Sequence, residues 1–306
     1  MILVLGSGGF LGKRLCRLLS KKKTAFEQIQ GKSDLDLRNP NDVDNFFRKS
    51  KPKYIINCCA NVGGIQYGYK WPADIFFDNT QIQINIFKYS IKSGVKRLIN
   101  PIPNCAYPHK QKLFKEDNIW DGEMHESVMT YGFVKKGYLI GSWAFKQQYD
   151  FEVINLIFSN LYGPEDHFEE ERSHALGAIV MKISNAIKHN QKSVTLFGTG
   201  KPVREWLHVD DASESLVRSL DIPYSTSPLN IGIGKGISIK ELADLVKTYT
   251  GYKGEIIFDE SKPDGDSFKT MDGNLAKKIM SWGPEIKFKN GLKNTINWYL
   301  NNKTNE

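Results

Sequence analysis

The stretch that decides the fold is Ile2–Leu15, which reads ILVLGSGGFLGKRL. Its first four residues form a short apolar run with the length and β-branching of a buried strand, and a helix pattern follows the glycines. Glycine recurs at every third position between them, which lets backbone N–H groups approach a diphosphate at the start of the helix. The stretch therefore predicts a dinucleotide site rather than a glycine-rich turn without a ligand. The predicted cofactor contacts in it are Gly6, Gly9, Phe10, Leu11 and Gly12.

Beyond this stretch, apolar runs alternate with helix patterns through the first half of the chain. Strands are expected at residues 54–60, 97–102 and 151–158, and helices at 79–94 and 131–150. The strand after the first helix is poorly marked, and we place it near residues 26–30. Alternation of this kind predicts parallel βαβ units, and hence an α/β fold with a Rossmann-type doubly wound parallel sheet.

After Tyr162 the spacing of the patterns changes, although no linker, repeat or low-complexity tract marks a boundary. We predict a dinucleotide-binding domain over residues 1–163, to which a later strand near 228–233 returns. Residues 164–306 are then expected to form mainly a smaller C-terminal substrate-binding lobe.

The end of the second strand is where a cofactor's adenosine ribose is expected to lie. A carboxylate there favours NAD, whereas a cation favours the 2′-phosphate of NADP. Lys32 comes first in the segment QGKSDLDLRN and favours NADP(H), with NAD as the alternative. Asp36 is a further candidate cofactor contact, which holds the adenine edge or only turns the chain.

Tyr131 and Lys135 are one helical turn apart and therefore lie on one face of a helix. A tyrosine with its ordinary pKa near 10 is a poor proton donor and acceptor at neutral pH. A nearby ammonium group lowers that pKa and can also hold the nicotinamide ribose. Downstream of a dinucleotide fingerprint, this pair predicts a catalytic tyrosine and lysine rather than a solvated surface pair.

Composition excludes several other classes of protein. The net charge is +8, but the lysines are scattered, which favours a solvated surface with a local anion site over a nucleic-acid-binding protein. The four cysteines form no CxxC pair and have no histidine at zinc-ligand spacing, so no metal site is expected. Few cysteines, no signal-peptide pattern and no apolar run of membrane-spanning length predict a cytoplasmic protein without a membrane segment.

Several longer segments carry a resemblance that covers most of the chain, to about Asp272. They are GSGGFLG, NVGGI, WPADIFFDN, NCAYP, YGFVKK, SNLYGPEDHF, RSHALGAIV, FGTGKPVREWLHVDD and KPDG. With them the chain resembles the extended short-chain dehydrogenase/reductase family, and within it the 3,5-epimerase/4-reductases of GDP-4-keto-6-deoxy sugars. The resemblance implies a GDP-sugar substrate, with other nucleotide sugars as alternatives, and a homodimer.

The resemblance also implies roles for individual residues. Cys105 and His174 match an acid/base pair that epimerises the carbons beside the C4 ketone, and Tyr131 matches the proton donor to the C4 oxygen. The matching substrate-binding positions are Asn160, Lys182, Arg204 and Lys269, and Arg204 suits a diphosphate because of its forked guanidinium.

The chain departs from the family at Pro103, where the family usually has a serine or threonine whose hydroxyl binds the C4 oxygen. Proline has neither a hydroxyl nor an N–H group, so Asn104 is the neighbouring residue that could supply a donor. The departure keeps three alternatives open: a 4-reductase without epimerisation, another nucleotide-sugar epimerase or dehydratase, and a catalytically weak nucleotide-binding sensor. Asn104 and Cys105 supply no acid/base carboxylate at this position, which argues against a dehydratase.

Overall fold

A computed structural model describes residues 1–169 and 172–303, so residues 170, 171 and 304–306 of the predicted second lobe lie outside the described residues. A six-stranded sheet forms the centre of the larger body, with the order β10-β5-β4-β3-β1-β2 and parallel pairing throughout. The strands are β1 (Ile2–Leu5), β2 (Phe26–Ile29), β3 (Tyr54–Asn57), β4 (Arg97–Pro103), β5 (Glu152–Phe158) and β10 (Leu229–Ile231). The predicted doubly wound sheet is confirmed, including the strand near residue 26 and the late strand that returns to it.

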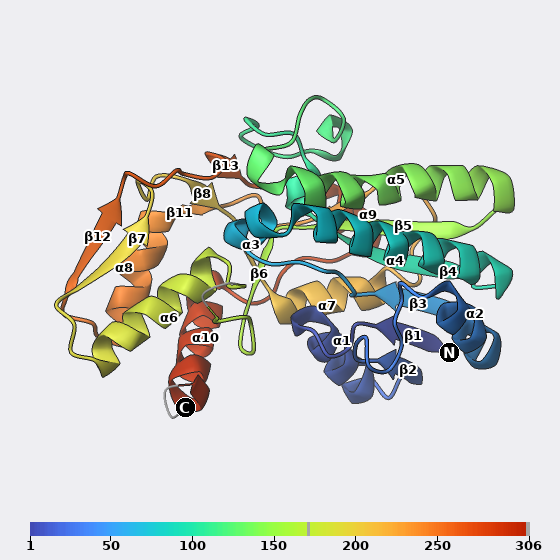
Figure 1. Cartoon of the computed structure of the whole chain (residues 1–306), viewed down its shortest axis with the longest axis horizontal. Coiled ribbons are helices and arrows are strands. Elements are labelled where there is room, and N and C mark those ends of the chain that lie inside the picture. The colour runs from blue at the N-terminus through green and yellow to red at the C-terminus, as the bar shows by residue number, and fades with distance from the viewer. Residues whose placement is uncertain (170–171, 304–306) are drawn as a thin grey trace.

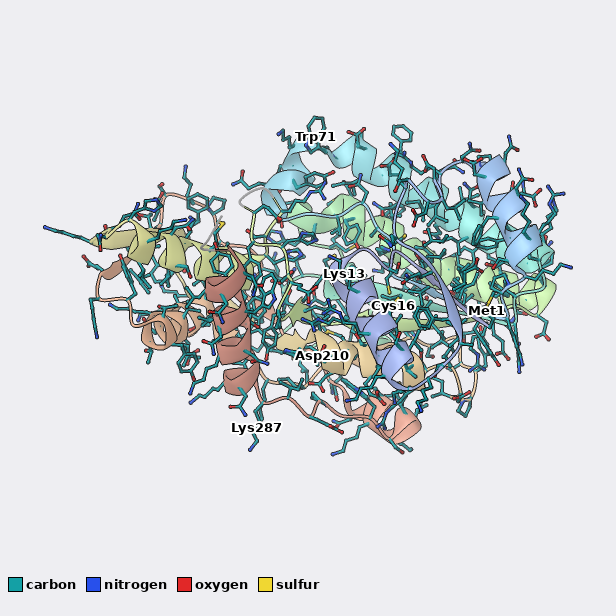
Figure 2. All side chains as sticks on the ribbon, turned by 90° about the horizontal axis from the view of Figure 1, so that it is seen from below. Met1, Lys13, Cys16, Trp71, Asp210 and Lys287 are labelled. Carbon is teal, nitrogen blue, oxygen red and sulfur yellow. The ribbon has the colours of Figure 1, made fainter. Side chains whose placement is uncertain are left out.

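Helices cover both faces of this sheet (Figure 1). One layer holds α2 (Pro40–Ser50), α4 (Pro72–Lys92) and α5 (Met129–Tyr149), preceded by the short helix α3 (Ile65–Lys70). The other holds α1 (Phe10–Lys21), α7 (Val209–Arg218) and α9 (Asn274–Met280). Figure 2 shows α1, with Lys13 and Cys16, beside α7, whose first turn carries Asp210. Segments late in the chain therefore complete the body that the N-terminal half begins.

A smaller body lies at one end of the sheet (Figure 1). Its helices are α6 (Ala175–Lys188), α8 (Ile239–Thr250) and α10 (Phe288–Lys303). Its strands are β7 (Ser193–Phe197) and β12 (Glu255–Asp259), which pair with each other, and β8 (Val203–Arg204), β11 (Ile237–Ser238) and β13 (Phe268–Lys269), which form a second small sheet. The helices pack on the strands around an apolar core of their own, built from residues such as Leu176, Ile183 and Leu242.

Local sequence signals fix several element ends. Ser238 caps α8 by accepting from the backbone N–H of Glu241, whose side chain accepts from the N–H of Ser238 in return, so the two residues form a capping box. Gly94 has a φ of +70° and ends α4, a conformation that suits glycine. A short strand pair, β6 (Asn160–Tyr162) with β9 (Trp206–His208), joins the two bodies next to the carboxyl end of β5.

Candidate active site

The glycine loop joins β1 to α1 at the carboxyl end of the sheet, as predicted. Gly6 has a φ of +77°, and a side chain there would meet the backbone of Cys58 at 2.8 Å. A side chain at Gly12 would overlap the carbonyl of Gly6, so α1 starts directly on the loop. Gly9 is the N-cap of α1 and supplies no side-chain cap, which leaves the first backbone N–H groups of the helix available to an anion. These residues fit the diphosphate of a dinucleotide.

At the expected ribose end, Arg38 changes the role predicted for Asp36. The Arg38 guanidinium donates to both Asp36 oxygens, at 2.9 and 2.8 Å, and to Asp78 at 3.0 Å. The hydrogen bonds from Arg38 lower the pKa of Asp36 to about 2. Asp36 is therefore an ionised partner of Arg38, whereas Lys32 is exposed beside it and remains the candidate for a 2′-phosphate.

The predicted pair on α5 lies inside the protein. The Lys135 ammonium group lies 5.6 Å from the centre of the Tyr131 ring and 5.2 Å from that of Tyr138, and Lys135 is 3% exposed. Burial lowers the pKa of Lys135 to about 8, and the neighbouring thiols, Cys59 foremost, partly oppose the shift. Burial also raises the pKa of Tyr131 above its usual value, which is opposite to the predicted lowering by the ammonium group. At neutral pH, Tyr131 is therefore protonated and suited to donate a proton.

Asn104 and Cys105 lie on the 3-10 turn Asn104–Ala106, directly after β4. The turn packs on α5 so closely that a side chain at Gly132 would meet the carbonyl of Cys105 at 2.5 Å, which brings Cys105 next to Tyr131. The Cys105 thiol is buried, and desolvation raises its pKa to about 11 although Lys269 and Lys135 oppose the shift. The thiol is therefore protonated at neutral pH.

The Asn104 amide is the unusual group of this turn. Asn104 is 5% exposed, and its Nδ2 atom is buried without a hydrogen-bond partner among the described residues. A buried amide nitrogen without a partner is costly, so such a group commonly awaits a ligand. Pro103, the last residue of β4, precedes it and offers no donor of its own.

His174 is the N-cap of α6 and enters the site from the smaller body. Its side chain is exposed, yet desolvation by the surrounding protein lowers its pKa, with further contributions from His167 and Lys269. The imidazole is therefore neutral at neutral pH. Since the Lys269 ammonium also acts on the Cys105 thiol, the structure places His174 and Cys105 within electrostatic reach of the same cation.

Arg204 and Lys269 are paired directly. They are opposite each other in the parallel pairing of β8 with β13, so their side chains leave the same face of that sheet. Both are half-buried, and desolvation lowers the pKa of each. Two half-buried cations side by side favour a dianionic ligand such as a diphosphate. Asn160 joins them through the carbonyl of Glu205, to which its Nδ2 donates at 3.0 Å.

Lys182 is engaged elsewhere. Its ammonium group donates to the carbonyl of Thr195 at 3.2 Å and lies 4.6 Å from the centre of the Phe197 ring, both on β7. In the structure, Lys182 therefore packs on β7 instead of joining Arg204 and Lys269.

Two charged residues of the site region were not singled out from the sequence, Arg38 and Glu205. Arg38 follows Asp36 by two residues, which is a spacing too common to signal an ion pair. Glu205 lies in the segment PVREWLH, where alternation indicates a side chain opposite to Arg204 but gives no sign that a glutamate is 0% exposed.

Over residues 1–169 and 172–303, no group of three or more His, Cys, Asp or Glu side chains could hold a metal ion. Within the same residues, no helix is long and apolar enough to cross a membrane.

A glycine loop after β1 and a tyrosine–lysine pair with a buried lysine on the helix after β4 define a dinucleotide-dependent enzyme of the short-chain dehydrogenase/reductase type. Residues 2–232 match the NAD dependent epimerase/dehydratase family, and this chain belongs to that family.

Curated relatives and solved structures match over nearly the whole chain. The probable GDP-L-fucose synthase 1 of Oryza sativa subsp. japonica is 34% identical over 303 residues, which are 98% of this chain and 92% of that protein. The crystal structure of a GDP-6-OMe-4-keto-L-xylo-heptose reductase from C. jejuni has a TM-score of 0.91 at 27% identity and covers 100% of this chain and 98% of its own. A GDP-L-fucose synthetase from Naegleria fowleri bound to NADP has a TM-score of 0.88 at 26% identity, with 99% of this chain and 93% of that chain covered.

Proposed function

We propose that the chain is an NADP(H)-dependent 3,5-epimerase/4-reductase that acts on a GDP-4-keto-6-deoxy sugar. The observation that carries the proposal is the meeting of Tyr131 and Cys105 beside the glycine-loop edge of the sheet, within reach of the paired cations Arg204 and Lys269. The names of the relatives support the substrate class, because they include GDP-L-fucose synthases and a reductase of a GDP-4-keto-heptose.

The cofactor would be held by the glycine loop and by Lys135. The backbone at the start of α1 fits its diphosphate, Lys32 its 2′-phosphate, and the Lys135 ammonium group its nicotinamide ribose. When bound, NADPH supplies the hydride that reduces the C4 ketone.

In the reduction, Tyr131 gives its proton to the C4 oxygen as negative charge develops there. Its raised pKa keeps the hydroxyl protonated at neutral pH, and Lys135 lies beside the ring to stabilise the phenolate that remains. The Nδ2 group of Asn104 is the further donor that we assign to the same oxygen, in place of the hydroxyl that Pro103 lacks.

In the epimerisation, Cys105 and His174 act on the carbons on either side of the C4 ketone, whose protons the ketone acidifies. One of the two removes a proton to leave an enolate, and the other returns a proton to the opposite face. Before substrate binds, the Cys105 thiol is protonated and the His174 imidazole is neutral, so the thiol can act as the acid and the free imidazole nitrogen as the base. Because His174 is exposed, a proton that it takes from the substrate exchanges with water.

Replacement of Tyr131 by phenylalanine tests the reduction. Tyr131→Phe removes the proton donor and keeps the ring beside Lys135, so NADPH consumption with GDP-4-keto-6-deoxymannose should fall roughly a hundredfold or more. Tyr149→Phe, at the exposed end of the same helix, is the matched control and should retain wild-type turnover. Full activity in Tyr131→Phe would overturn the assignment.

The substrate panel decides between the alternatives. Turnover only with a GDP-4-keto-heptose would leave the proposed reaction unchanged but make the substrate a heptose, as in the name of one structural neighbour. If NADPH binds to the protein but is not consumed with any 4-keto nucleotide sugar, the protein is a nucleotide-binding sensor and not an enzyme of this class.

We also propose that the protein is a homodimer formed through α4 and α5, which lie side by side (Figure 1). Both helices expose large apolar side chains, among them Phe77 at 69%, Phe133 at 59% and Trp143 at 57%. Exposed apolar groups clustered on two adjacent helices are typical of a subunit interface. Light scattering should give a dimer mass for the wild type and a monomer mass for Phe133→Asp; a wild-type monomer would contradict the proposal.

A cytoplasmic location remains a proposal as well. Cys16, Cys58, Cys59 and Cys105 are all unpaired in the structure, as expected for a protein in reducing surroundings. Cell fractionation would test it, and recovery of the protein in an oxidising compartment would contradict it.

A further inference from the structure

Glu205 is a completely buried glutamate between β8 and β9. Its Oε1 accepts the backbone N–H of Ile233 at 2.6 Å, and its Oε2 accepts that of Met271 at 2.8 Å. Within residues 1–169 and 172–303, no Lys, Arg or His forms an ion pair with it; the backbone N–H groups of Ile233, Met271 and Gly234 and the Ser159 side chain stabilise its charge instead. Burying a carboxylate without a cationic partner costs free energy. The presence of a charged residue at this position therefore needs an explanation.

The backbone of Glu205 reaches two of the residues assigned to the substrate. Its N–H donates to the carbonyl of Lys269 at 3.1 Å, and its carbonyl accepts from the side chain of Asn160 at 3.0 Å. Arg204 precedes it in the chain. Glu205 therefore contacts or adjoins all three substrate residues that the structure brings together.

The carboxylate also holds the strands that carry these residues. The carboxylate of Glu205 accepts from the N–H of Met271, and the backbone N–H of Glu205 donates to the carbonyl of Lys269. The segment that contains β13 is therefore bonded to Glu205 on both sides of Thr270. Through Ile233 the carboxylate ties the β8–β13 strand pair to the segment that follows β10 of the main sheet. The carboxylate is tightly packed against the backbone of Gly232, where a side chain would overlap Oε1.

We infer that Glu205 is a positioning residue whose ionised carboxylate sets Asn160, Arg204 and Lys269 for the diphosphate of the nucleotide sugar, an inference that rests on the proposed function. The ionised carboxylate offers a strong acceptor oxygen to both Ile233 and Met271. In a protonated carboxyl group one oxygen carries the proton and is a much weaker acceptor, so one of these two hydrogen bonds weakens.

Protonation of Glu205 falls in an accessible pH range. Burial raises its pKa to about 7, against the opposing effect of its backbone hydrogen bonds. The titratable residues in the segments that adjoin its hydrogen-bond partners are Arg204, His208, Lys235, Lys269 and Asp272, and none of them is among the causes that shift the pKa of Glu205. As the pH falls through about 7, Glu205 gains a proton and the substrate residues lose their support. Protonation of histidines near the site would instead strengthen the binding of an anion, so the two effects have opposite signs.

Calorimetry with GDP-mannose is the test, because its diphosphate diester does not titrate in this range. At about pH 8, Glu205→Gln should bind GDP-mannose roughly tenfold more weakly than the wild type, because its amide can accept only one of the two N–H groups. At about pH 6, wild-type binding should weaken to that of the variant, whose own affinity changes little. NADPH affinity should be the same in both proteins.

Asp211→Asn is the matched control. Asp211 is also a buried carboxylate that accepts two backbone N–H groups, those of Glu285 and Ile286 at 3.0 and 3.1 Å, but it touches none of the substrate residues. This variant should keep the wild-type affinity for GDP-mannose and its dependence on pH.

The outcomes separate the inference from the proposed function. Wild-type affinity in Glu205→Gln, or a wild-type affinity that does not weaken on acidification, overturns the inference and leaves the proposed function intact. A wild type that does not bind GDP-mannose at any pH overturns both. If Glu205→Gln fails to fold, the pH dependence of the wild type and of Asp211→Asn decides alone.

Discussion

The glycine loop and the β8–β13 strand pair are both expected to bind a diphosphate, but they offer it different chemical groups. The loop offers backbone N–H groups at the start of α1 and comes from seven consecutive residues. The strand pair offers two side-chain cations, Arg204 and Lys269, which are 65 positions apart in the chain and are held by a third segment through Glu205. Tight packing of small residues shapes the first site, and hydrogen bonds around a buried charge shape the second.

The difference determines how each site should fail. A backbone site depends on the absence of side chains and should be destroyed by any added volume. A side-chain site depends on charge and distance, so it should weaken by degrees and respond to pH.

Gly12→Val should have the largest effect. Because even a Cβ atom would overlap the Gly6 carbonyl, the loop and α1 must move apart. We expect the free energy of unfolding to fall by about 3 kcal/mol and NADPH binding to be lost. Urea unfolding and NADPH fluorescence measure the two effects. Gly283→Ala, where a Cβ meets nothing within 4 Å, is the control; NADPH binding that survives in Gly12→Val would contradict the account of the loop.

Asn104→Ala tests the donor assigned to the C4 oxygen. Loss of one hydrogen-bond donor at a developing alkoxide costs roughly a hundredfold in kcat, and KM should change little. The double variant Pro103→Ser with Asn104→Ala should recover part of that loss, because serine restores a hydroxyl at the preceding position. An unchanged kcat in Asn104→Ala would show that its unpartnered Nδ2 serves no catalytic purpose.

Arg204→Lys should weaken the substrate site without destroying it. Lysine keeps the charge beside Lys269 but loses the forked pair of donors, so KM for the nucleotide sugar should rise roughly tenfold while NADPH affinity is unchanged. Steady-state kinetics and NADPH titration separate the two. Lys182→Met is the comparison, because Lys182 packs on β7 and its loss should leave KM unchanged.

The smallest effect is expected from pH. The pKa of Lys135 is lowered to about 8, so its ammonium charge is present below that pH and is lost as the pH rises through it. At about pH 8, kcat/KM for NADPH should have fallen to roughly half of its plateau, since this ratio reports ionisation in the free enzyme. Lys136→Gln, a buried neighbour over the Trp120 ring, should leave the profile unchanged. A flat profile up to about pH 9.5 would contradict the role of Lys135.

The same comparison explains what the sequence could predict. The parallel sheet, the glycine loop and the tyrosine–lysine pair follow from patterns within single segments, and the structure has all three. The strand near residue 26 was also predicted, although only its last residue is buried and both Phe26 and Glu27 are half-buried.

The substrate side could not be predicted from spacing. Cys105, His174, Arg204 and Lys269 come from four separate segments, and only the resemblance to a family connected them. Burial was the second effect that the sequence did not show. It raises the pKa of Tyr131, whereas the sequence indicated a lowered one, and it also raises the pKa of the Cys105 thiol. Burial also explains why Glu205 was missed, since a glutamate in an alternating strand is normally a solvated residue.

The most direct test of the central claim is one reaction in heavy water. The wild-type protein is incubated with NADPH and GDP-4-keto-6-deoxymannose, and the product is examined by mass and proton spectra. The account predicts a sugar reduced at C4 that carries deuterium at C3 and C5, because the proton returned to each carbon comes from an acid/base pair that has exchanged with heavy water. A reduced sugar without deuterium would contradict the role of Cys105 and His174, and no reduction of any 4-keto nucleotide sugar would contradict the enzyme itself.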